Sequence, residues 1–78
     1  GVYVRGRSKE NIIELPDYWT GLVDASTITV NITPIGSSQD IYVNAIENNA
    51  IYLGGEIKEY FFTVYGERKD VDKLIVEY

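Results

Sequence analysis

Hydrophobic and polar residues alternate along much of this chain, and the alternation predicts β-strands. The clearest example is the run 26–33, where Ile28, Val30 and Ile32 alternate with Thr and Asn residues. A period of two places these three side chains on one face of a half-buried strand. Pro34 should end the strand, because proline cannot donate a hydrogen bond to a sheet ladder.

A β-hairpin is predicted in the middle of the chain. Residues 40–47 and 50–53 form two further β-type runs, and the pair Asn48-Asn49 separates them. Asn tolerates the left-handed backbone conformation that tight hairpin turns require. Two glycines at 54–55 are expected to end the second arm.

The N-terminal part of the chain is less regular. Residues 2–6 are predicted to form a strand, 7–11 an exposed turn, and 12–15 the arm that returns from this turn. One short helical turn is predicted after this arm, near residues 17–23.

The helical turn is expected to belong to the core. Asp17 is its candidate N-cap, and a helix this short is stable only when it packs against the rest of the domain. We therefore expect Tyr18, Trp19 and Leu22 to cover one end of the sheet as a core plug.

The C-terminal stretch contains two β-type runs separated by a charged segment. In the first run, 57–65, hydrophobic residues occupy both faces, which is typical of a strand that lies centrally in a sheet or between a core and a partner. Gly66 then indicates a bulge or a close approach of other atoms to the backbone. Residues 74–78 are expected to form a last strand that pairs across a subunit boundary. The candidate residues of an oligomer interface are Tyr60, Phe61, Phe62, Tyr65, Arg68, Ile75 and Tyr78.

Together these segments predict one all-β domain over residues 1–78. The expected architecture is a small antiparallel β-sandwich or meander of about six to seven strands, with one short helical turn near residues 17–23. An intertwined trimer is also compatible with the strand pattern, which leaves the strand order open.

The composition favours a domain that gains stability from association. The chain has 78 residues and contains neither Cys nor His, so disulfides and metal sites built from soft ligands are excluded. A domain near this size typically buries only about 60% of the surface that its unfolded chain exposes. Small domains without a disulfide or a metal often rely on a partner chain. We therefore expect a symmetric homo-oligomer, with a trimer favoured.

Charge and hydropathy argue against two classes of partner. Seven Lys and Arg residues against twelve Asp and Glu residues give a net charge of -5, which repels the phosphate backbone of nucleic acids. No apolar run approaches the roughly 18 residues of a membrane-spanning helix. Nucleic-acid binding and membrane insertion are therefore not expected.

The residue types offer little catalytic chemistry. Without His, the ordinary triad that activates a serine or cysteine nucleophile cannot be formed. Carboxylate oxygens remain as ligands for Ca²⁺ or Mg²⁺, and the nearest arrangement, Asp70-Val71-Asp72, lacks the Gly and terminal Glu of an EF-hand loop. A glycosidase-like pair of carboxylates stays formally open. We expect no enzymatic activity, no cofactor and no metal site.

Four blocks of this sequence resemble a C-terminal region of phage virion structural proteins. They include the motifs ELPDYW and YGERKD and occur in the same order as in those proteins. The blocks are residues 2–7, 11–23, 28–36 and 62–70. The proteins that they resemble are tail-fibre-like and occur in marine phages, including cyanophages.

This resemblance implies a β-rich, homotrimeric module of a virion fibre or appendage, synthesised in the host bacterial cytoplasm. In longer relatives another segment precedes the region, so the chain looks like a domain excised from a longer fibre-like protein. The implied function is structural: the module contacts other virion proteins and supports host attachment. The alternative is a receptor-binding head that contacts a host surface glycan or protein through exposed Tyr and Asn side chains. The resemblance brings no catalytic residues.

Overall fold

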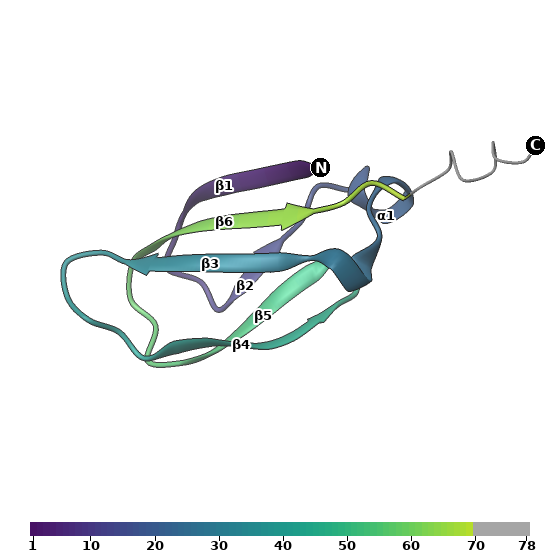
Figure 1. Ribbon diagram of the computed structural model, residues 1–78. Coiled ribbons are helices and arrows are strands. Elements are labelled where there is room, and N and C mark those ends of the chain that lie inside the picture. Colours follow the sequence, from purple (N-terminus) through teal and green to yellow (C-terminus); the bar gives the residue numbers. More distant parts are fainter. Residues whose placement is uncertain (70–78) are drawn as a thin grey trace, which may run out of the picture.

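The computed structural model describes residues 1–69, which form two three-stranded antiparallel sheets (Figure 1). The first sheet has the order β1-β6-β3 and the second has the order β2-β5-β4. The all-β prediction is therefore confirmed. The strands are β1 (Val2–Ser8), β2 (Ile12–Glu14), β3 (Thr29–Pro34), β4 (Ile41–Glu47), β5 (Ala50–Gly55) and β6 (Tyr60–Gly66).

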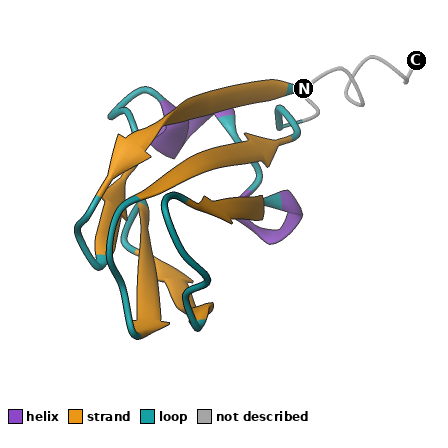
Figure 2. Ribbon diagram, turned by 90° about the vertical axis from the view of Figure 1, so that its left-hand side faces the viewer, coloured by secondary structure: helices purple, strands orange, loops and turns teal. Residues whose placement is uncertain are grey.

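The two sheets enclose one hydrophobic core, so the fold is a small sandwich rather than a meander. Figure 2 shows the strands and their connecting loops after a rotation of 90° from Figure 1. Both sheets contribute to the core, which also takes up residues of the short helix. The buried cluster is Ile13, Leu15, Trp19, Val23, Ile51, Leu53, Tyr60 and Val64.

Consecutive strands alternate between the sheets, except for β4 and β5. This order corrects the prediction that 12–15 return alongside 2–6, because β1 and β2 lie in different sheets. β1 also continues to Ser8, beyond the predicted strand end, and pairs with β6 over its whole length. Its partner comes from the other end of the chain, so no local turn signal announces the pairing.

Two hydrogen bonds hold Glu10 in the crossing from β1 to β2. The Ser8 hydroxyl accepts from the Glu10 N–H at 2.9 Å, and the buried Tyr60 donates its hydroxyl to the Glu10 carbonyl at 2.5 Å. The segment after Ser8 is therefore fixed on the core strand β6, and the chain passes to the second sheet.

The strand predicted over 26–33 begins later than expected. Ala25–Thr27 form a 3-10 turn, and β3 starts at Thr29. The reason is Asp24, whose Oδ1 accepts from both the N–H and the hydroxyl of Ser26 at 3.1 and 2.7 Å. Such local bonds compete with the sheet ladder. Pro34 is the last residue of β3, as predicted.

The predicted hairpin is confirmed between β4 and β5. Asn48 and Asn49 have φ angles of 54° and 57°, the left-handed values of a tight hairpin turn. Asn49 has a second role, because its Nδ2 donates to the carbonyls of Leu15 and Pro16 at 3.1 and 3.0 Å. The hairpin is therefore tied to the end of β2.

Matched glycine substitutions should separate the two roles of these asparagines. Asn48→Gly is expected to change the free energy of unfolding by less than about 0.5 kcal/mol, because glycine adopts positive φ without strain. Asn49→Gly should cost about 1–3 kcal/mol, because the Leu15 carbonyl loses this donor and the Pro16 carbonyl keeps only the N–H of Trp19. Urea unfolding of both variants checks this, and equal effects would contradict the role of the Asn49 amide.

The predicted helical turn is α1, which spans Trp19–Leu22. Its N-cap is Tyr18 and no side chain caps it, so the expectation for Asp17 was wrong. Asp17 instead offers its backbone carbonyl, which accepts from the N–H and the hydroxyl of Thr20. Within residues 1–69, no helix has the length and hydropathy needed to cross a membrane.

The three residues predicted as a core plug have different environments. Trp19 is 1% exposed, and Leu22 is half-buried against the core cluster. Tyr18 is 63% exposed, so its assignment to the core was wrong: a single helical turn directs its side chain away from the sheets. The indole Nε1–H of Trp19 has no hydrogen-bond partner within the described residues. Trp19 therefore stabilises the fold through apolar contact.

β6 is the central strand of the first sheet, as its two apolar faces predicted. It starts at Tyr60 rather than Ile57, although Ile57 still packs against the core. Gly66 allows the predicted close approach, because a Cβ at this position would lie 2.6 Å from Cγ1 of Val23.

Candidate interaction surfaces

The outer face of the first sheet carries a patch of exposed aromatic side chains. Alternate residues of β6 point away from the core, and each has one neighbour on β1 and one on β3. We call this patch the aromatic face. It consists of the rows Tyr3–Tyr65–Thr29, Arg5–Thr63–Asn31 and Arg7–Phe61–Thr33.

The aromatic side chains of this face are accessible to solvent. Tyr3 is 60% exposed, Phe61 48% and Tyr65 39%. Tyr3 and Tyr65 are directly opposite in the ladder, and the Tyr65 ring lies beside Gly1. A cluster of aromatic residues on one face of a small domain is characteristic of an interaction surface.

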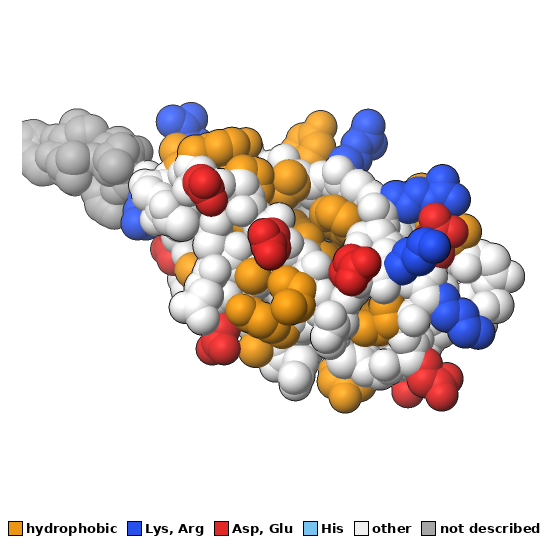
Figure 3. All heavy atoms as spheres, turned by 180° about the vertical axis from the view of Figure 1, so that it is seen from behind, with side chains coloured by type: hydrophobic (Ala, Val, Ile, Leu, Met, Phe, Trp, Pro, Cys, Tyr) orange, Lys and Arg blue, Asp and Glu red, His pale blue; other side chains and the backbone are white. Residues whose placement is uncertain are grey.

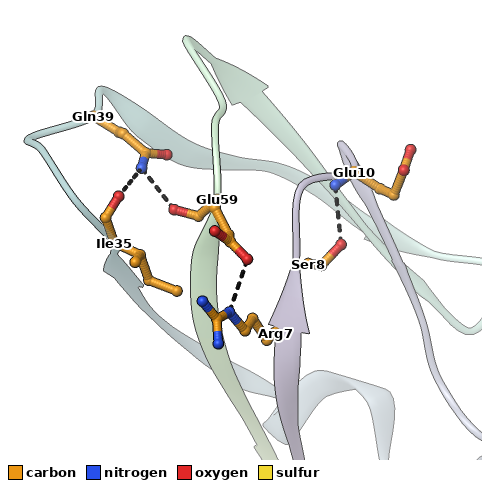
Figure 4. Close-up of polar contacts among 6 residues, drawn as sticks. All are labelled: Arg7, Ser8, Glu10, Ile35, Gln39 and Glu59. Carbon is orange, nitrogen blue, oxygen red and sulfur yellow. Dashed lines mark hydrogen bonds and ion pairs between the residues drawn. The ribbon is translucent and has the colours of Figure 1, made fainter.

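Two arginines of β1 lie on the same face. Arg7 donates from Nε to Oε2 of Glu59 at 2.8 Å (Figure 4), and its guanidinium carbon lies 5.5 Å from the centroid of the Phe61 ring. Arg5 makes no ion pair or side-chain hydrogen bond among residues 1–69. A shallow hollow lies between Arg5, Arg7, Phe61 and Thr63. This face therefore combines apolar area with positive charge, although the chain as a whole is acidic.

The outer face of the second sheet is apolar at its centre and acidic at one end. Glu14 and Glu47 lie on either side of Ala50 in the ladder. The Tyr42 ring covers the space above Gly54, where a Cβ would lie 2.7 Å from its ring carbons. We call this surface the acidic face. It consists of Ile12, Glu14, Tyr42, Ala45, Glu47, Ala50, Tyr52 and Gly54.

Polar groups beside the acidic face add to its negative character. A hollow is lined by Glu14, Asp17, Asn48 and Tyr52 together with apolar neighbours. Figure 3 shows, on the rear of the molecule, Asp and Glu side chains that stand among exposed hydrophobic side chains. No member of the acidic face is Lys or Arg.

The residues predicted for an oligomer interface do not lie together. Phe61 and Tyr65 belong to the aromatic face, whereas Tyr60 is 0% exposed in the core and therefore cannot contact another chain. Tyr60 was wrongly assigned because alternation separates the two faces of a strand without identifying the inner one.

The other predicted interface residues lie elsewhere. Phe62 is half-buried on the inner side of β6, where its ring lies 2.9 Å from the Cβ position of Gly6. Arg68 is exposed beyond β6 and forms an isolated bridge with Val23. Ile75 and Tyr78, with the predicted strand 74–78, lie outside the described residues.

Sequence reasoning missed Tyr3, Arg5 and Arg7 as surface residues of one face. Their spacing of two was visible in the N-terminal run. The missing information was the pairing with β6, which brings these side chains beside Phe61 and Tyr65.

Residues 1–69 contain no cluster of three or more acidic side chains placed to hold a metal ion. The Asp70-Val71-Asp72 arrangement lies outside these residues. Glu14 and Asp17 share a hollow with Tyr52 and Asn48, an arrangement suited to hydrogen bonding with hydroxyl or amide groups. The two faces thus offer apolar area, charged groups and hydrogen-bonding groups.

No family model matches this chain, and no curated protein and no solved structure matches it.

Proposed function

We propose that this chain is a structural and oligomerisation module of a phage virion appendage, a tail-fibre-like protein that supports host attachment. The module assembles as a homotrimer through its aromatic face and contacts other virion proteins. Its role is association rather than catalysis. The sequence blocks that resemble tail-fibre-like proteins support the appendage, and the aromatic face supports the association.

The observation that carries the association is the alignment of Tyr3, Phe61 and Tyr65 on one outer sheet face. Burial of an exposed large apolar side chain is worth about 1.5–3 kcal/mol. A small domain without disulfides gains the most from such burial, because its own core is limited. A copy that covers this face therefore adds stability that the isolated domain lacks.

A charge placed on the aromatic face should separate the copies. Tyr65→Glu is expected to weaken association about a hundredfold, or ~2.8 kcal/mol, because a carboxylate would be buried among aromatic rings. Size-exclusion chromatography with light scattering measures the mass of the assembly.

Tyr18→Glu is the matched control, because Tyr18, the N-cap of α1, is 63% exposed and belongs to neither face. This variant should keep the wild-type mass. Circular dichroism establishes that both variants are folded. A folded Tyr65→Glu variant with undiminished association would contradict the proposal.

The second candidate function is a receptor-binding head. The hollow that contains Glu14, Asp17, Asn48 and Tyr52 favours it, because carboxylates, amides and an aromatic ring together can hold the hydroxyls and the apolar face of a sugar. A glycan array probed with the wild-type chain and with Tyr52→Ala distinguishes the candidates. Saturable binding that Tyr52→Ala abolishes would support the receptor-binding head.

A further inference from the structure

We infer that the aromatic face of one copy is covered by the acidic face of the next copy. The contact is heterologous, because each copy uses a different surface on its two sides. This inference rests on the oligomerisation proposed above and identifies the second surface that takes part in it.

The first step concerns Arg5. Arg5 lies in the middle row of the aromatic face, between the row of Tyr3 and the row of Phe61. Any chain that covers these aromatic rings also covers Arg5, which has no ion pair or side-chain hydrogen bond among residues 1–69. Burial of a charge without a partner is strongly unfavourable. The covering surface must therefore supply a carboxylate.

The second step excludes the aromatic face as its own partner. Contact between two aromatic faces would bury Arg5 and Arg7 of both copies in one interface. The other polar members of the face are Thr and Asn side chains, which carry no negative charge. Glu59 is already paired with Arg7 at 2.8 Å. Like charges that meet across an interface oppose association, so this arrangement is disfavoured.

The third step identifies the acidic face. Glu14 and Glu47 flank Ala50 on three adjacent strands, which places their backbones about 10 Å apart at 4.7–4.9 Å per strand. Ala50 itself is 5% exposed, and it lines a hollow together with Glu14 and Tyr52. Arg and carboxylate form strong, directional pairs, so this end of the acidic face suits Arg5 and Arg7.

The apolar parts of the two faces also correspond. Tyr42, Tyr52 and Ile12 provide the apolar area of the acidic face, and Tyr42 is 56% exposed and Ile12 39% exposed. The aromatic face offers Tyr3, Phe61 and Tyr65 in return. Each face thus has an apolar region beside charged side chains. These side chains are arginines on the aromatic face and glutamates on the acidic face.

The two faces lie on opposite sides of the sandwich, because each is the outer face of a different sheet (Figure 1). Every copy therefore presents one face to each neighbour. A heterologous contact closes into a ring when the rotation between copies allows closure, and otherwise continues as a filament. The favoured trimer is a ring of three copies, which requires the two contact areas of each copy to be inclined to each other; parallel contact areas would stack the copies into a filament.

Charge reversal on one face at a time tests the inference. In R5E/R7E both faces are acidic, and in E14R/E47R both faces are basic. Each variant alone is expected to associate at least about a hundredfold more weakly than the wild type, because its two faces now repel. In an equimolar mixture the two variants should alternate and form 1:1 complexes with an even number of copies, because a ring of three would bring two like faces together. R5E/R7E/E14R/E47R should regain the self-association of the wild type, because its two faces again have opposite signs.

Light scattering and native mass spectrometry measure mass and stoichiometry, and circular dichroism establishes folding. R5E alone is a second variant of the aromatic face. It leaves the ion pair between Arg7 and Glu59 intact, so its effect cannot come from the loss of that pair. E10R/E56R is the control: both residues are exposed outside the strands, and the charge change equals that of E14R/E47R. This control should keep the wild-type mass.

Undiminished self-association of E14R/E47R would overturn the heterologous contact and leave the proposed oligomerisation standing. A wild-type chain that stays monomeric at high concentration would overturn both.

Discussion

Trp19→Ala is expected to lower the free energy of unfolding by about 3–5 kcal/mol, the usual cost of removing a large aromatic side chain from a core. Trp19 is 1% exposed and belongs to the buried cluster that joins both sheets. Natural domains have total stabilities of about 5–15 kcal/mol, so a domain of this size should be largely unfolded by the change. Urea titration followed by far-ultraviolet circular dichroism measures the loss. All samples have the same chain concentration, because the proposed association would add to the measured stability.

Tyr18→Ala is the control for this substitution. Tyr18 precedes Trp19 and is aromatic, but it is 63% exposed. Its removal should change the free energy of unfolding by no more than about 0.5 kcal/mol. Equal losses for the two variants would show that Trp19 is not the residue that closes the core.

Gly55→Ala is expected to cost about 2–4 kcal/mol, because two unfavourable effects combine. Gly55 has a φ of 101°, which residues with a side chain rarely adopt, and an added Cβ would collide with the backbone carbonyl oxygen of Asp40. That oxygen also accepts from the Glu56 N–H at 2.9 Å. The substitution should therefore separate the start of β4 from the end of β5.

The same change at Gly21 is the matched comparison. Gly21 lies in α1, and an added Cβ there meets no atom within 4 Å. Gly21→Ala should leave stability unchanged or raise it by about 0.5–1 kcal/mol, because alanine favours the helix. Thermal unfolding of both variants gives the comparison, and a neutral Gly55→Ala would contradict the close contact between β4 and β5.

Local features of the fold were predictable from the sequence because their causes are local. The alternation of Ile28, Val30 and Ile32 follows from the pleat of a strand. The hairpin follows from the left-handed tolerance of Asn48 and Asn49. In both cases the information lies within a few residues of the structure that it determines.

The arrangement of the strands was not predictable in the same way. β1 pairs with β6 because both can bury one face on the same core, and this depends on residues from the two ends of the chain. Whether Tyr60 or Phe61 is buried in the core also depends on contacts between distant parts of the chain. Alternation defines two sets of side chains, and only the position of the second sheet decides which set is buried.

The candidate site follows from this long-range pairing. Phe61 and Tyr65 were predicted as interface residues from the two-faced character of their strand. Arg5 was missed, since its place beside Thr63 depends on the register between β1 and β6. The acidic face was missed for a similar reason, because Glu14 and Glu47 become neighbours of Ala50 only when β2 and β4 pair with β5.

The central claim is that copies of this chain associate through a face that is exposed in the single copy. Sedimentation equilibrium over a hundredfold range of chain concentration tests it most directly. We expect the mass of three chains, with no decrease on dilution through the micromolar range. A mass of one chain at every concentration, with the fold intact by circular dichroism, would contradict the account.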